Sequence, residues 1–294
     1  MKNNLLQIRN FSMAFGENVL FTNFDYDFKP GIYVLSGPSG VGKSTLMRII
    51  AGLETRYTGD IILNDNKYSS YSPNVHMVHQ HYTSFPWLSL LKNTLMVYKG
   101  HKAKPDVDDV NEAKEILKKL GLEEHINKLP SQISGGQDQR LSLASAFINK
   151  WSSVILYDEP TSALDNINDM LIVDMIKEHQ KKYGTIEIII THEEHVIEGL
   201  NATILDFTPE FRLRPPKVTV QEEKKEADKS KLELTDTHVQ ESEVDLSNSQ
   251  SKDEKDESVN VSKEDVKEML YFKQNWLCKI VTSAKMWIRK FFKR

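Results

Sequence analysis

A glycine-rich segment between two apolar runs constrains this chain more than any other feature of its sequence. Residues 37–45 read Gly-Pro-Ser-Gly-Val-Gly-Lys-Ser-Thr and fit the spacing G-x-x-x-x-G-K-[ST]. An apolar run at 32–35 precedes this segment, and a helix-like pattern over 45–53 follows it. Similar apolar runs recur at 154–157 and 186–190, and such runs are typical of strands buried on both faces of a parallel sheet. The pattern predicts an α/β fold whose mainly parallel sheet is flanked by helices.

The residue types in this segment suit a phosphate ligand. Glycine lets the backbone bend so that its N–H groups surround an anion, and a helix that begins near Gly42 directs its positive end to the same place. Lys43 would reach the β- and γ-phosphates of a nucleotide, and the Ser44 hydroxyl would bind Mg²⁺. A glycine-rich turn without a ligand is the alternative, and kinases and GTPases also contain such a segment. The predicted nucleotide-binding residues here are Gly37, Pro38, Ser39, Gly40, Val41, Gly42, Lys43, Ser44 and Thr45.

Two adjacent carboxylates end a second apolar run. Asp158 and Glu159 follow residues 154–157, at the carboxyl end of a predicted strand, where open α/β sheets bind ligands. Asp158 is predicted to hold Mg²⁺, directly or through water, and Glu159 to act as the general base for an attacking water. A solvated acidic turn is the alternative, but the phosphate-binding segment argues against it.

A third motif indicates a family. Residues 133–140 read Ile-Ser-Gly-Gly-Gln-Asp-Gln-Arg, which closely resembles the L-S-G-G-Q-x-Q-R signature of ATP-binding cassette (ABC) ATPases. A serine and two glycines at a helix start make a second anion-binding end, which is useful if it serves another subunit. Alone, the motif would be interpreted as an ordinary capped helix. The predicted signature residues are Ser134, Gly135, Gly136 and Gln137.

Four further residues fall in the order expected for that family. Phe15 matches the aromatic residue that stacks on adenine, and Gln80 resembles the glutamine that follows a core strand. Asp165 ends a stretch similar to the loop that joins two ATP sites, and His192 resembles the histidine that contacts the γ-phosphate. The resemblance covers essentially all of residues 1–210.

The resemblance implies a P-loop NTPase core with an N-terminal antiparallel β subdomain and a helical subdomain inserted at about 84–145, within an ATPase domain spanning 1–215. It also implies that two cassettes pack head to tail and that each ATP lies between the phosphate loop of one and the signature of the other. Because this chain has one set of motifs, a homodimer or a similar partner subunit is expected. The implied catalytic residues are Lys43, Glu159 and His192, and the implied Mg²⁺ ligands are Ser44, Gln80 and Asp158.

The leading functional hypothesis is the ATP-hydrolysing motor subunit of an ABC transporter. Residues 85–93, Phe-Pro-Trp-Leu-Ser-Leu-Leu-Lys-Asn, are similar to the stretch by which importer-type ATPases grip a permease, so Trp87 is a candidate partner contact. Alternatively, Trp87 fills the core of the helical subdomain. A cassette ATPase acting on ribosomes or DNA, and an ATP-binding subunit that hydrolyses slowly, are the alternative functions. The permease would be another chain, because no run of eighteen apolar residues is present.

The charge of the chain changes sharply after the predicted domain. Residues 216–262 carry 13 acidic and 7 basic residues and no aromatic one, which predicts a disordered acidic linker, with a charged stalk helix as the alternative. Residues 263–294 carry 9 basic and 3 acidic residues, with apolar residues at helical spacing, which predicts a basic amphipathic helix. We expect this helix to lie on an anionic membrane surface, with a partner protein or nucleic acid as alternatives. Its candidate membrane contacts are Trp276, Lys285, Trp287 and Arg289.

Composition excludes several other classes. The single cysteine, Cys278, excludes a disulfide framework, and the net charge of −4 argues against a general nucleic-acid binder, so no nucleic-acid partner is expected. The expected location is the cytoplasm, peripheral on the inner face of the cell membrane. Histidines such as His79 and His195 are predicted to be ordinary loop residues, since the spacing of His192 and His195 is not that of a zinc protease.

Four positions depart from the family pattern, the mildest being Ile133 in place of the usual leucine. Asp138 stands where a basic or neutral residue is more usual, Ser145 where arginine is common, and Tyr157 where an aliphatic residue is commoner. None of these changes removes a catalytic group.

Overall fold

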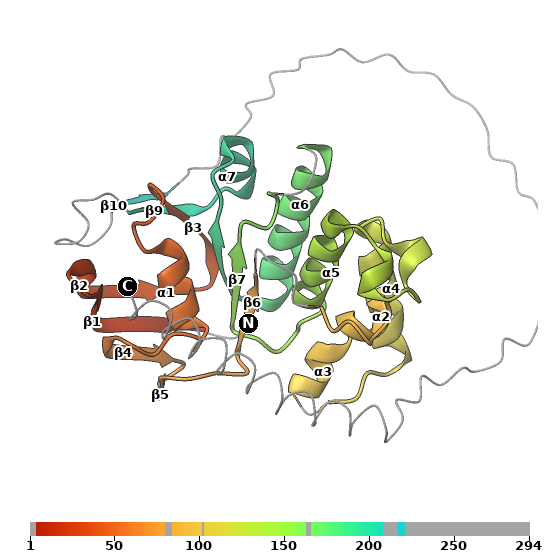
Figure 1. The fold of residues 1–294 in the computed structure, drawn as a ribbon, viewed down its shortest axis with the longest axis horizontal. Coiled ribbons are helices and arrows are strands. Elements are labelled where there is room, and N and C mark those ends of the chain that lie inside the picture. Colours follow the sequence, from red (N-terminus) through yellow and green to blue (C-terminus); the bar gives the residue numbers. More distant parts are fainter. Residues whose placement is uncertain (1–3, 80–83, 102, 163–165, 208–216, 221–294) are drawn as a thin grey trace, which may run out of the picture. The chain divides into compact units, whose positions relative to one another are not determined.

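The computed structural model describes residues 4–79, 84–101, 103–162, 166–207 and 217–220 (Figure 1). All of them lie in the first of two compact units, Met1–Ala227, whereas the second unit, Asp228–Arg294, lies outside the described residues. The predicted basic helix therefore stays a prediction. So do the roles assigned to Trp276, Lys285, Trp287 and Arg289.

A six-stranded sheet forms the centre of the described fold. Its strand order is β10 (Lys217–Val220), β9 (Thr203–Asp206), β3 (Gly31–Ser36), β8 (Ile186–Ile190), β7 (Val154–Asp158) and β6 (Val75–Val78). Neighbouring strands from β9 to β6 are parallel, and β10 is antiparallel to β9. Every residue of β7 and β8 is buried, so the continuous apolar runs do mark strands covered on both faces, and the predicted α/β fold is confirmed.

A second sheet contains four antiparallel strands. Its order is β2 (Asn18–Phe28), β1 (Leu6–Phe15), β4 (Thr58–Leu63) and β5 (Asn66–Tyr68), which confirms the expected antiparallel subdomain. Aromatic side chains join the two sheets in one hydrophobic core: the Phe21 ring lies 5.1 Å from that of Phe11 and 6.2 Å from that of Phe207, at the end of β9. Edge-to-face pairs of this kind add to the stability gained by burial.

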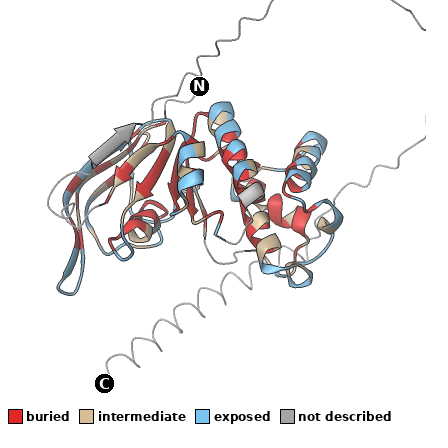
Figure 2. Cartoon of the chain, turned by 90° about the horizontal axis from the view of Figure 1, so that it is seen from above, coloured by how far each residue is buried: buried red, intermediate tan, exposed pale blue. Residues whose placement is uncertain are grey.

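Helices complete the described fold on both faces of the six-stranded sheet. They are α1 (Lys43–Ile50), α2 (Leu90–Thr94), α3 (Met96–Gly100), α4 (Val107–Lys119), α5 (Gly135–Phe147), α6 (Asn166–Tyr183) and α7 (Glu194–Leu200), with short 3₁₀ turns at Glu123–His125 and Pro130–Gln132. Helices α2 to α5 form the inserted helical region, on the opposite side of the six-stranded sheet from the antiparallel sheet (Figure 1). Their inward sides and the strands carry the buried residues of a second hydrophobic core (Figure 2). Among the described helices, none is both long and apolar enough to cross a membrane.

The ordered chain extends beyond the predicted domain boundary at residue 215. Strand β10 pairs with β9 from Lys217↔Asp206 to Val220↔Thr203, inside the segment predicted to be disordered. The prediction is therefore wrong for residues 217–220. Its physical reason is local, because the β-branched residues Val218, Thr219 and Val220 favour a strand, whereas the prediction used the average composition of 216–262. The rest of that segment lies outside the described residues.

A buried polar network crosses the sheet. Glu187, the second residue of β8, is fully buried, and its Oε1 accepts a hydrogen bond from Thr185 Oγ1 and lies 2.8 Å from His179 Nδ1. His179 Nε2 donates to the Asn149 carbonyl at 3.1 Å. Burial and the neighbouring Glu187 carboxylate raise the pKa of the Tyr157 hydroxyl well above its usual value. These contacts replace the hydration that Glu187 and His179 lose on folding.

Breaking this network from one side should destabilise the fold. We expect His179→Ala or Glu187→Ala alone to lower the free energy of unfolding by about 3–5 kcal/mol, since each removes one side of a buried pair and leaves the other side chain with a single hydrogen-bond partner. The double variant should lose less than the sum of the two. Urea unfolding of the unchanged protein, the two single variants and the double variant measures these losses. The control is Glu178→Gln, on the exposed side of α6, which should change the free energy of unfolding by about 0.5 kcal/mol or less. Additive losses would show that the two side chains do not depend on each other.

A half-buried histidine contacts one of the positions that depart from the family pattern. His76 Nε2, in β6, lies 3.1 Å from Ser145 Oγ in α5, and Ser145 Oγ itself donates to the Ser142 carbonyl at 2.7 Å. Because that bond uses the hydroxyl proton, His76 Nε2 is the donor to Ser145. Burial, with a smaller effect of His179, lowers the pKa of His76 to about 4. Ser145 thus serves as the hydrogen-bond acceptor for a neutral, half-buried imidazole.

The lowered pKa of His76 predicts acid sensitivity. As the pH falls below about 6.5, the unfolded chain protonates His76 while the folded chain does not, so stability should fall between about pH 6.5 and pH 4. The full effect is about 3 kcal/mol for this shift. Urea unfolding at a series of pH values should show a shallower pH dependence for His76→Gln than for the unchanged protein. Parallel curves would contradict this assignment.

Candidate functional site

The glycine-rich loop between β3 and α1 requires backbone angles that other residues rarely adopt. Gly37 has φ +134°, and a Cβ there would lie 2.3 Å from the Phe207 carbonyl oxygen. Gly42, the residue before the first turn of α1, has φ +110°, and its Cβ would lie 2.9 Å from the Phe21 ring. The loop therefore wraps tightly against the core and brings the positive end of α1 to its concave side.

Lys43 is buried at the base of this loop. Its Nζ donates to the Gly37 carbonyl at 2.6 Å and to the Pro38 carbonyl at 3.0 Å, so the ammonium group is held inside the loop. Burial lowers the pKa of Lys43, while the Glu159 and Asp158 carboxylates oppose this shift. A partly desolvated cation surrounded by backbone groups is suited to a polyanion.

The carboxyl end of β7 brings two carboxylates to the same place. Asp158 Oδ1 lies 3.3 Å from Ser44 Oγ, so a hydroxyl and a carboxylate oxygen stand side by side. Glu159 follows with φ +53°, and its N–H donates to the Ile190 carbonyl at 2.9 Å. This turn directs Asp158 and Glu159 to different parts of one site.

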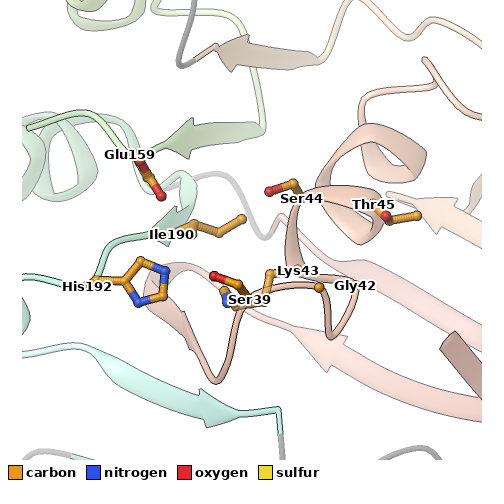
Figure 3. Close-up of a pocket in the computed structure, with 9 residues that line it drawn as sticks. Ser39, Gly42, Lys43, Ser44, Thr45, Glu159, Ile190 and His192 are labelled. Carbon is orange, nitrogen blue, oxygen red and sulfur yellow. The ribbon is translucent and has the colours of Figure 1, made fainter. Parts of the chain in front are cut away.

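An open pocket of about 180 Å³ lies between these segments (Figure 3). Glu159 and His192, which follow β7 and β8, lie across it from Ser44 and Thr45 of α1 (Figure 3). The lining residues are Ser39, Gly40, Gly42, Lys43, Ser44, Thr45, Glu159, Ile190 and His192. Backbone N–H groups, an ammonium and hydroxyls suit a phosphate chain, and the oxygens of Ser44 and Asp158 are hard ligands that suit a divalent cation such as Mg²⁺.

Comparison with known proteins shows what this chain is similar to. The family model described as "ABC transporter" matches residues 21–162. The spermidine/putrescine import ATP-binding protein PotA of Thermotoga maritima is 36% identical over 195 residues, which are 64% of this chain and 52% of that protein. The Fe(3+) ions import ATP-binding protein FbpC of Fusobacterium nucleatum is 34% identical over 193 residues, with the same coverages.

Solved structures of ATP-binding cassettes are also similar to this chain. An ATP-binding cassette determined as a dimer in a post-hydrolysis state, bound to ADP and Pi, aligns with a TM-score of 0.60 and 25% identity over 74% of this chain and 99% of that one. This chain therefore resembles ATP-binding cassettes over residues 21–162 and in its fold. It spans about half the length of the two curated relatives above.

The structure places the predicted residues at different positions relative to this pocket. Those that line the pocket are Ser39, Gly40, Gly42, Lys43, Ser44, Thr45, Glu159 and His192. Gly37, Pro38 and Asp158 support it through the hydrogen bonds described above, and Val41 is buried beside it. Phe15, at the end of β1, is 41% exposed and lies outside the lining, with the Arg56 guanidinium 5.1 Å from its ring centre. Gln80 and Asp165 lie outside the described residues.

The signature residues are not part of this chain's own pocket lining. Ser134 precedes the first turn of α5, where its Oγ accepts from the Gln137 N–H and its N–H donates to Gln137 Oε1. This reciprocal cap fixes the start of the helix, and Ser134 and Gly135 are exposed. The positive end of α5 is thus open to solvent.

Sequence reasoning missed contacts that link the motifs to one another. Gln139, inside the signature segment but not predicted as a site residue, donates from Nε2 to the Glu159 and Pro160 carbonyls at 3.1 and 3.2 Å. Thr161 Oγ1 donates to Glu193 Oε2 at 3.0 Å and so joins the loop after β7 to the loop after β8. Ile190 lines the pocket from the last position of β8. Of these residues, only Gln139 could have been suspected from the sequence, because it lies inside the signature segment.

The tight fit of Gly42 predicts a sensitive position. Gly42→Ala should shift the phosphate loop, because alanine disfavours φ +110° and its Cβ would meet the Phe21 ring. We expect at least tenfold weaker binding of a fluorescent ATP analogue. The control is Gly100→Ala at the end of α3, where a Cβ meets nothing within 4 Å and binding should be unchanged. Equal affinity for Gly42→Ala and the unchanged cassette would show that the loop does not set nucleotide affinity.

Proposed function

We propose that this chain is the ATP-binding and ATP-hydrolysing motor subunit of an ABC transporter. The observation that carries the proposal is the convergence of the phosphate loop, Asp158, Glu159 and His192 on one pocket. Backbone N–H groups of residues 37–45 and the Lys43 ammonium would bind the phosphates of ATP. Phe15 would stack on the adenine, for which an exposed ring face suffices.

The cation and the water would lie on the opposite side of the pocket. Ser44, Asp158 and Gln80 would hold Mg²⁺, which neutralises charge on the phosphates. Glu159 would accept a proton from the attacking water at its carboxylate, and His192 would contact the terminal phosphate. The 3.3 Å separation of Ser44 Oγ from Asp158 Oδ1 supports a shared cation.

A second cassette would complete each site. Ser134, Gly135, Gly136 and Gln137 are not in the pocket lining of their own chain, and the capped start of α5 is a preformed anion-binding end. Head-to-tail pairing would bring that end to the partner's nucleotide, with Asp165 in the loop between the two sites. The partner is a second copy or a similar subunit, and the dimeric cassette structure supports such pairing.

The permease contact is proposed at the loop before α2. Asn93 is buried, and its side chain bonds both the N–H and the carbonyl of Phe85 and the carbonyls of Leu88 and Ser89. This fixes Trp87, whose half-buried ring lies 5.6 Å from that of Phe85. A rigid aromatic surface suits a short helix from a membrane partner. The relatives named above are import ATP-binding proteins, which supports a place on the inner face of the cell membrane.

Glu159→Gln tests the enzymatic proposal. The amide keeps the shape of the side chain but cannot accept the water proton, so ATP hydrolysis should fall by about 100-fold or more while ATP binding is retained. Phosphate release and binding of a fluorescent ATP analogue measure the two effects separately. Glu115→Gln, exposed on α4, should retain full activity. Unchanged hydrolysis by Glu159→Gln would remove the general base from this mechanism.

The same variant tests the transport proposal, because a cassette that binds but does not hydrolyse ATP should stay in its closed dimer. Tagged Glu159→Gln would be purified from gently solubilised membranes with ATP and Mg²⁺, and its companions identified by mass spectrometry. A stoichiometric multi-spanning protein is the expected result. Ribosomal or DNA-associated proteins in its place would overturn the transport proposal.

A further inference from the structure

Three side chains from two helices converge beside the nucleotide pocket without lining it. Asp169 lies in the first turn of α6, and Glu193 and His195 lie at the start of α7. His195 Nε2 is 3.0 Å from Asp169 Oδ2 and 3.8 Å from Glu193 Oε2, and one ligand atom of each residue lies within 4.8 Å of the others. We call these three residues the α6–α7 cluster.

The cluster contains two carboxylates and one imidazole, and one carboxylate oxygen is left without a partner among the described residues. Asp169 is only 1% exposed, and within the described part of the chain its Oδ1 has no hydrogen-bond partner. Across the same residues, neither Asp169 nor Glu193 forms an ion pair with lysine or arginine, and the basic side chain within ion-pair distance of both is His195. A buried carboxylate with one oxygen unsatisfied is costly unless a cation reaches it.

We propose that the α6–α7 cluster binds a first-row divalent cation of the zinc type. One imidazole and two carboxylates are a ligand set that such metals accept, and three protein ligands leave a fourth position for water. Bonds of about 2.0–2.1 Å in a tetrahedral site place ligand atoms roughly 3.3 Å apart. The observed separations of 3.0 and 3.8 Å from His195 Nε2 bracket that value.

The surroundings of the cluster support a bound cation. Thr161 Oγ1 donates to Glu193 Oε2 and orients that carboxylate, as outer hydrogen bonds do in metal sites. The side chains of His195 and Glu193 are 41% and 33% exposed, so a cation can enter from solvent while Asp169 closes the inner side. Binding would cross-link α6 to α7. It would also fix the position of Glu193, which directly follows His192.

Titration of the metal-free full-length protein with Zn²⁺ tests the proposal. Calorimetry should show a zinc site that Asp169→Asn and His195→Gln each weaken at least tenfold, and Zn²⁺ should raise the melting temperature of the unchanged protein more than that of either variant. Co²⁺ should give the intense visible absorption of a four-coordinate site. His125→Gln, a half-buried histidine outside the cluster, should bind Zn²⁺ like the unchanged protein.

Two outcomes would overturn the proposal. If Asp158→Asn abolishes Zn²⁺ binding and the cluster variants do not, the ion occupies the nucleotide pocket. If no variant alters binding, or no Zn²⁺ binds, the α6–α7 cluster is a hydrogen-bonded contact only. Should Asp169→Asn fail to fold, which circular dichroism would detect, His195→Gln decides the question because its side chain is partly exposed.

Discussion

The register of three parallel strands determines where the residues of the candidate site lie. β7 pairs with β8 from Val154↔Ile186 to Asp158↔Ile190, and β3 pairs with β8 up to Val34↔Ile189. The carboxyl ends of parallel strands meet at one edge, so the phosphate loop, the Asp158–Glu159 turn and the His192 loop emerge together. A shift by one residue in this pairing would separate Ser44 from Asp158 and move Glu159 out of the pocket.

Burial of β7 and β8 on both faces restricts what their side chains can be, yet polar residues are present before the carboxyl ends of both strands. Tyr157 and Glu187 lie on neighbouring strands in the interior, and the fold accepts them because His179 and Thr185 contact Glu187. Tyr157, where the family more often has an aliphatic residue, thus lies next to a carboxylate that is itself partnered. The polar network ties α6 to β8, so it holds the helix that carries Asp169.

Short motifs and buried strands were predictable because each is specified by residues that are adjacent in the sequence. The phosphate loop, the Asp158–Glu159 pair and the fully buried β7 and β8 each follow from adjacent residues. β10 was missed because a four-residue strand is hidden in an acidic segment judged by its average. Two hydrogen bonds could not be predicted because they join residues distant in sequence, which only the folded chain brings together. They link Gln139 to the Glu159 carbonyl and His195 to Asp169. The spacing of His192 and His195 excluded a zinc pattern within one helix, but it could not show a ligand supplied by another helix.

The hydrogen bonds of Gln139 show how two sites in a proposed dimer would be coupled. Helix α5 presents its capped start to solvent, where a partner's nucleotide would bind, while four residues into the same helix Gln139 holds the carbonyls of Glu159 and Pro160 in its own chain's site. Thr161, the residue after Pro160, donates a hydrogen bond to Glu193, which follows His192 in the chain. A rearrangement of the Glu159 loop would therefore pull on the helix end that serves the other nucleotide. Coupling of this kind needs only rigid elements that share hydrogen bonds, and the buried, capped α5 is such an element.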